Sequence, residues 1–352
     1  MNSQLATRHI GLVQAASFAV ASLAMLTGLA QAADTTYIAS ENANSYGHFD
    51  QNATNTTVAP NGTTSNFLIT PNNPGVSAMG PAACAPTSAA NSFIYLQNQY
   101  GLTGLVNLGN PYGTISTLAA NMNTAPATSV GGSQTNYTGG GTTDGNFVQG
   151  KEAYLQNLAP GGFTAPNGQK YAIQTVGQSA FYSQAASGPW KGGVTQTAPT
   201  AQFIEQQLAA GEDVEMGISW SNGSGGYSGA GGHMVALTGI NYDATTNSGT
   251  VSFVDPTNNS GGNITYGTGD APNITSSSLE MITSGTYNGY LKFSYTGGAS
   301  GIAADDNSGA STTALIDGVF AESPVLVPEP TGLVLLAVAG LGVLMLRKRR
   351  SA

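Results

Sequence analysis

Apolar residues recur at helical spacing in a stretch that begins near residue 86. Between residues 86 and 100 they come at steps of four, three and four residues, which places them on one face of a helix. These residues are Ala89, Phe93, Leu96 and Tyr100. Gly101 follows, and glycine is favoured just past a helix end, whereas Pro86 is tolerated only in a first turn. The pattern therefore predicts a helix whose N-terminus lies at or just after Cys84.

Residues 200–210, "TAQFIEQQLAA", carry a second helical pattern. Thr200 is a favourable N-cap and Gly211 follows the last alanine, so both helix ends are marked. Downstream, apolar and polar positions alternate as in half-buried strands. The predicted strands are residues 214–220, 233–240, 250–256 and 289–295. A turn-rich loop joins the second to the third and predicts an antiparallel hairpin. A cysteine-bearing helix followed by a later antiparallel sheet predicts an α+β domain.

The N-terminus has the pattern of a secretory signal peptide. Arg8 precedes an apolar run over residues 16–29, and small residues stand at the cleavage positions 30–32. A membrane-spanning helix is the alternative, but the run is short for a bilayer. We expect residues 1–32 to be removed on export, with cleavage after Ala32.

A second apolar run lies at the C-terminus, over residues 331–346, and the basic cluster "RKRR" follows it at once. Basic residues directly after an apolar run hold that end in the cytoplasm. The pattern predicts a single C-terminal transmembrane helix, with the preceding chain on the far side of the membrane.

Removing both ends leaves an acidic chain of 330 − 32 = 298 residues, enough for one large domain. It keeps 4 lysines and all 18 acidic residues, a net charge of 4 − 18 = −14, and has no arginine. A nucleic-acid surface needs clustered Lys and Arg, so nucleic acid is not an expected partner. Residues 33–75 are a low-complexity segment rich in Asn, Thr and Ser, and residues 296–326 are predicted to be a spacer with one candidate strand at Ala314 to Phe320. Residues 76–295 remain as the predicted folded domain.

Cys84 is the only cysteine of the 352 residues, so an intramolecular disulfide framework is excluded. A thiol is mostly protonated at neutral pH unless a helix N-terminus or a nearby imidazolium stabilises the thiolate. The helix start supplies the first of these. Of the three histidines, His9 leaves with the signal peptide and His48 lies in the low-complexity segment, which leaves His233. A solvated or structural histidine is the alternative interpretation.

The predicted hairpin gives His233 a carboxylate neighbour. Pairing 233 with 255 centres the turn at (233 + 255)/2 = 244, inside the turn-rich loop, so Asp255 is expected near His233. A carboxylate there would orient the ring and stabilise its protonated form. The alternative is that "DPTNN" is simply a turn, and both interpretations can hold together.

Four segments in this order resemble the papain-like cysteine peptidases, closest to the C39-like group: "CAPTSAANSFIYL", "FIEQQLAAGEDVEMGISW", "GGHMVALTGINYD" and "GTVSFVDPTNN". The resemblance implies a papain-like domain over 76–295 with an N-terminal catalytic helix and a later antiparallel sheet. It makes Cys84 the nucleophile, His233 the general acid/base and Asp255 the orienting residue. The separation of 233 − 84 = 149 positions from the cysteine to the histidine belongs to that resemblance.

The chain departs from the family at the oxyanion site. The family places glycine directly after the cysteine, where Ala85 stands here, and a glutamine about six residues before it, where Ala78 stands. Loss of one oxyanion donor costs about 10²–10³ in rate. The backbone N–H of Cys84 and the side chain of Asn73 are the candidate donors that remain.

The C-terminus resembles the PEP-CTERM sorting signal of Gram-negative bacteria. Val327, Pro328, Glu329 and Pro330 are followed by the apolar run and the basic end, so residues 327–352 form the expected signal. The resemblance implies that the chain is an exosortase substrate, at least transiently anchored in the inner membrane. Its destination would be the cell envelope or extracellular matrix, often in species that make exopolysaccharide.

Together these features predict an exported, membrane-tethered thiol hydrolase, a cysteine peptidase acting on a peptide or protein. A catalytically inactive binding or matrix protein of the exopolysaccharide layer or biofilm is the alternative, and a purely structural surface protein is a third. No cofactor is expected. One cysteine and one usable histidine do not make a zinc site without several carboxylates, so no metal is expected. No glycine-rich loop with lysine is placed to hold a phosphate.

Overall fold

The computed structural model divides the chain into two compact units, residues 1–36 and 37–352. It describes residues 36–49, 51, 55–58, 64–67, 80–125, 128–129, 137–138, 141–181, 193–220, 227, 232–256, 274–295 and 312–327. All of these except Thr36 belong to the second unit. The predicted signal peptide and the predicted transmembrane run lie outside the described residues.

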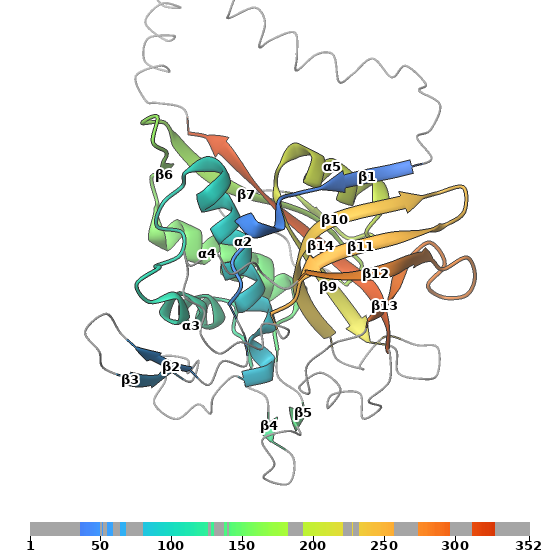
Figure 1. The fold of residues 1–352 in the computed structure, drawn as a ribbon, viewed down its shortest axis with the longest axis horizontal. Helices are drawn as coiled ribbons and strands as arrows, with labels where there is room; N and C mark the ends of the chain where they lie inside the picture. Colours follow the sequence, from blue (N-terminus) through green and yellow to red (C-terminus); the bar gives the residue numbers. More distant parts are fainter. Residues whose placement is uncertain are drawn as a thin grey trace, which may run out of the picture. The chain divides into compact units, whose positions relative to one another are not determined.

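One large, mostly antiparallel sheet of ten strands organises this unit (Figure 1). Its hydrogen-bonded order is β1-β10-β11-β12-β13-β14-β7-β6; β8 pairs in parallel with β7, and β9 pairs with both β10 and β14. The strands are β1 (Thr36–Ser40), β6 (Phe163–Thr164), β7 (Lys170–Ser179), β8 (Val194–Thr195), β9 (Asp213–Trp220), β10 (Gly232–Asp243), β11 (Ser248–Val254), β12 (Ile274–Met281), β13 (Leu291–Tyr295) and β14 (Thr312–Leu326). Two small sheets pair β2 (Asn55–Val58) with β3 (Thr64–Phe67), and β4 (Thr128–Ser129) with β5 (Tyr137–Thr138).

The double pairing of β9 closes six strands into a ring. Each strand from β9 to β14 is hydrogen-bonded to two others of the six, because β9 joins β10 to β14. Each of these strands therefore has a partner on both sides for part of its length, which limits its free edge. Strand β14 is central to the arrangement, since it pairs with β9, β13 and β7 along its fifteen residues. It lies in the segment for which the sequence predicts a spacer.

Four α-helices accompany the sheet in the described part of the chain: α2 (Cys84–Tyr100), α3 (Pro111–Asn121), α4 (Asp144–Leu158) and α5 (Ala201–Ala210). Short 3₁₀-helices, η2 (Ala43–Ser45) and η3 (Gly80–Ala83), precede α2. The helix ends follow the chemistry of capping. Thr200 Oγ1 accepts the N–H of Phe203 at the start of α5, and Gly101 and Gly211 take positive φ angles of 66° and 78° just past α2 and α5. Both predicted helices are thereby confirmed.

Two apolar cores lie on either side of the strands. The first packs α2, α3 and α4 against residues of β10 and β14 that include Met234 and Phe320, and Figure 1 shows these three helices together on one side. The second joins α5 to the inward residues of the ring strands, with Trp220 and Phe253 among its largest members. Both cores reach the residues that the sequence singles out for function.

The predicted fold class is wrong. We expected an α+β, papain-like (C39-like) domain with a catalytic helix, a later sheet and a single C-terminal transmembrane helix. The described chain is instead a mostly antiparallel ten-stranded sheet with four helices, and its first strand, β1, precedes every helix. Within the described ranges, no helix is long and apolar enough to cross a membrane.

The physical reason is that long-range pairing builds the sheet. Strand β1 pairs with β10 and β7 pairs with β14, across more than 130 residues in each case, and such partners leave no local signal. The sequence does not predict helices α3 and α4, for a related reason. Both contain Gly and Asn, and α3 also contains two Thr; these are weak helix formers, and packing against α2 and against each other compensates for this.

Candidate active site

Cys84 is the first residue of α2, as predicted, and its side chain is buried in the first core with 9% exposure. The helix dipole places partial positive charge at this end of α2. Ser88 lies one turn further along the same face of α2. Its hydroxyl donates to the carbonyl oxygen of Met234 at 2.9 Å. The helix start is therefore tied to β10 at the residue directly after His233.

His233 is the second residue of β10, and Asp255 comes one residue after β11 ends. The predicted hairpin is present, with a different register: Ala236 pairs with Val254, so the strands are shifted by two residues from the expected 233–255 pairing. A shift of two keeps the side chains at this end of the hairpin on their face of the sheet, whereas a shift of one would reverse them. A bulge between Leu237 and Gly239 changes the register further toward the turn. The two side chains therefore still meet, and His233 Nε2 lies 2.9 Å from Asp255 Oδ1.

Cys84, the third residue of the candidate site, interacts with the same imidazole. The Cys84 side chain lies close enough to the imidazole of His233 to raise the pKa of that ring. Because Nε2 is engaged by Asp255, the nitrogen that remains for the sulfur is Nδ1. The structure thus brings all three sequence-predicted residues together, from α2, β10 and the end of β11.

The charge state of His233 follows from these contacts. Burial disfavours the imidazolium and lowers its pKa, but attraction to Asp255 and hydrogen bonds to Asp255 and Cys84 outweigh burial and raise the pKa to about 10. The ring is therefore protonated at neutral pH. An imidazolium beside a thiol at a helix N-terminus is the arrangement that generates a reactive thiolate.

Two aromatic residues that the sequence analysis did not single out enclose the pair. Trp220, the last residue of β9, stacks on His233 with a centroid separation of 6.2 Å and an interplanar angle of 19°. The phenol O–H of Tyr295, the last residue of β13, donates to Asp255 Oδ2. A sequence signal existed, because each closes a predicted strand with an aromatic residue on its apolar face. Which strand ends lie close together depends on how strands β9 to β14 pair into a closed ring.

The remaining predicted residues are placed only in part. Asn73 and Ala78 lie outside the described residues, as do Pro328, Glu329 and Pro330 of the sorting motif. Val327 is described, and its N–H donates to the carbonyl oxygen of Lys170 at 2.8 Å, so the chain stays attached to the sheet up to that motif. The oxyanion donors stay a prediction.

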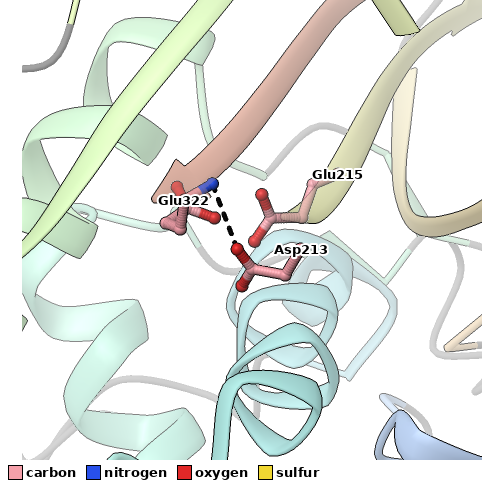
Figure 2. A group of neighbouring side chains, drawn as sticks. All are labelled: Asp213, Glu215 and Glu322. Atoms are coloured by element: carbon pink, nitrogen blue, oxygen red, sulfur yellow. Dashed lines mark hydrogen bonds between the residues drawn. The ribbon is translucent and has the colours of Figure 1, made fainter. Parts of the chain in front are cut away.

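A second polar group lies away from Cys84, at the start of β9. Figure 2 shows Asp213, Glu215 and Glu322 turned toward one another. Each is fully buried, and one carboxylate oxygen from each lies within 4.8 Å of the others. Such a set could offer oxygen ligands to a cation. Lys151 of α4 already supplies a positive charge there: its Nζ lies 2.8 Å from Glu215 Oε2 and also contacts Glu322 Oε1. Its ammonium occupies the position of a cation between the two glutamates.

Hydrogen bonds and protons complete that cluster. Thr175 Oγ1 donates to Glu322 Oε1 at 3.1 Å, and the backbone N–H of Glu322 donates to Asp213 Oδ1 at 3.0 Å. Burial and the neighbouring carboxylates raise the pKa of both Asp213 and Glu215 well above the ordinary range. The group is best described as a proton-holding ionic cluster that ties α4 to β9, β14 and β7.

The chain matches no protein-family model, no curated protein and no solved structure. The resemblance to papain-like peptidases and to the PEP-CTERM signal therefore stays a prediction from the sequence, and the geometry around Cys84 carries the functional conclusion.

Proposed function

We propose that the protein is a thiol hydrolase, a cysteine peptidase in which Cys84 is the nucleophile, His233 the general acid/base and Asp255 the orienting residue. The observation that carries the proposal is that Asp255 and Cys84 both interact with the imidazole of His233. His233 and Asp255 come from one hairpin, Cys84 comes from a helix 149 positions before His233, and the thiol belongs to the only cysteine. The substrate class is a peptide or protein, and the chemistry needs no cofactor.

The reaction begins with attack of the Cys84 thiolate on the carbonyl carbon, which forms a C–S bond and a tetrahedral oxyanion. The His233 imidazolium donates its proton to the leaving amine, the C–N bond breaks, and a thioester remains. Neutral His233 then takes a proton from water, and the hydroxide attacks the thioester. Release of the acid restores the thiolate and the imidazolium. Asp255 holds Nε2 throughout, which keeps Nδ1 aimed at the sulfur.

The test uses the full chain with peptide and protein substrates, compared with Cys84→Ser and Cys84→Ala variants. Cleavage by the parent should disappear in both variants, because neither offers a thiolate. Labelling by iodoacetamide should add one group to the parent and none to the variants, since no second cysteine competes. Cleavage that survives in Cys84→Ala at the parental rate would exclude this mechanism.

A second candidate is a catalytically inactive binding or matrix protein. One observation favours it: Cys84 and His233 are only 9% and 6% exposed, so little of either side chain meets solvent. The pH dependence of Cys84 alkylation separates the two. A thiolate held by an imidazolium reacts at acidic pH, whereas an inert thiol reacts only above its ordinary pKa of about 8.5.

The proposed setting is the envelope of a Gram-negative bacterium. The signal-peptide pattern of residues 1–32 and the sorting pattern of residues 327–352 support export, transient anchoring in the inner membrane and processing by an exosortase. Fractionation of cells that express the chain with and without residues 327–352 tests this. The full chain should appear in membrane and envelope fractions, and the shortened chain should be released.

A further inference from the structure

The carboxylate of Asp255 is held at both of its oxygens. His233 Nε2 lies 2.9 Å from Oδ1, and the phenol O–H of Tyr295 donates to Oδ2. The site is dry, because Asp255 and Tyr295 are 1% and 3% exposed. In such surroundings an ionised carboxylate depends on the donors that surround it.

Tyr295 is itself fixed by packing. Its ring lies edge-on to Trp220 at 5.0 Å and to His233 at 6.2 Å, and it stacks on Phe253 at 6.1 Å. Its backbone pairs with Thr312 of β14. The closed ring of strands therefore places the phenol oxygen of Tyr295 at the carboxylate of Asp255, which is forty residues away in the sequence.

We propose that Tyr295 is a positioning residue of the candidate catalytic site, whose phenol O–H keeps Asp255 ionised and aimed at His233. This inference rests on the proposed thiol chemistry, and it concerns how the Cys84–His233 pair keeps its charges as the pH falls.

A hydrogen bond to a carboxylate stabilises its ionised form, so a carboxylate that loses a donor takes up a proton at higher pH. The titratable groups acting on His233 are Asp255 and Cys84, and Tyr295 contacts both Asp255 and the imidazole ring. If Asp255 is protonated, the His233 imidazolium loses the negative charge that stabilises it most. The thiolate of Cys84 then loses its cationic partner.

The experiment measures the rate constant of Cys84 alkylation by iodoacetamide from pH 4 to pH 10 in the full chain. In Tyr295→Phe the volume is kept and only the donor is removed. We expect the acid limb of the profile to move up by about one pH unit, which is about a fivefold lower rate at the midpoint of the parental limb. Tyr242→Phe is the matched control: Tyr242 is equally buried in the second core, but its hydroxyl lies near Asn247 and not at the site. Its profile should equal the parent's.

A second variant tests the same donor without removing it. Incorporation of a ring-fluorinated tyrosine at position 295 makes the phenol a stronger donor, so the acid limb should move down. This arm also applies if Tyr295→Phe does not fold. A folded Tyr295→Phe protein with the parental profile, or a fluorinated protein whose limb does not move down, overturns the proposal. If the proposed hydrolase function is wrong, the result is different: the parent protein shows no acid limb of Cys84 reactivity and cleaves no peptide.

Discussion

Replacing Lys151 by methionine tests the buried ionic cluster most directly. Methionine keeps the length and apolar stem of the side chain and removes the ammonium that lies 2.8 Å from Glu215 and contacts Glu322. All three side chains are fully buried, so no water replaces the lost charge. The cation also lies 4.3 Å from the ring centroid of Phe147, a contact that disappears with it.

The expected cost is large for one substitution. Removing one partner of a buried ion pair destabilises a protein by about 3–5 kcal/mol, because the other charge stays buried and uncompensated. For a domain of this size, that corresponds to a fall in melting temperature of about 10 °C. The carboxylates can take up protons instead, so the loss should be smaller at pH 5 than at pH 8. Thermal unfolding followed by circular dichroism at both pH values measures it.

Lys292→Met provides the matched control. Lys292 also pairs with a glutamate, Glu280, at 3.2 Å, but both side chains are well exposed, at 35% and 57%. A surface pair contributes about 0–1 kcal/mol, so its loss should shift the melting temperature by no more than a few degrees. If Lys151→Met melts within a degree of Lys292→Met at pH 8, the cluster does not depend on the ammonium and our account of it is wrong.

Three further outcomes are expected. In Asp255→Asn the largest attraction on the His233 imidazolium is lost, so NMR titration should move the pKa of that ring from about 10 toward its ordinary value near 6.5; an unchanged titration would contradict the assigned cause. Burial raises the pKa of Glu41 and of Asp317 to about 8. Between about pH 5 and 8 the folded chain holds these protons, whereas the unfolded chain has lost them. The free energy of unfolding should therefore decrease as the pH rises over this range, by about 1.4 kcal/mol per pH unit for each proton. A melting temperature that rises over this range would contradict these pKa shifts. Gly150→Ala should destabilise the chain by about 1–3 kcal/mol in denaturant unfolding. The new methyl group would lie 2.5 Å from the α-carbon of Met122, the C-cap residue of α3. Parental stability would show that α3 and α4 can move apart without cost.

The sequence alone was informative where the chemistry is local. The caps of α5 and the left-handed glycine after α2 are determined by neighbouring residues, and both helices were predicted with their ends. The hairpin of β10 and β11 follows from alternation and a turn. Its parity places His233 and Asp255 on one face even though the register differs by two residues.

Tertiary structure decided the rest. The sequence by itself determined that one thiol begins a helix, that one histidine begins a strand and that one carboxylate follows the next strand. Only the closed ring of strands decided that Tyr295 would hold that carboxylate and that Glu322 would join Asp213 across 109 residues. Side-chain periodicity reports which face is buried, whereas strand order depends on pairings between distant segments, and a single sequence carries no local signal of them.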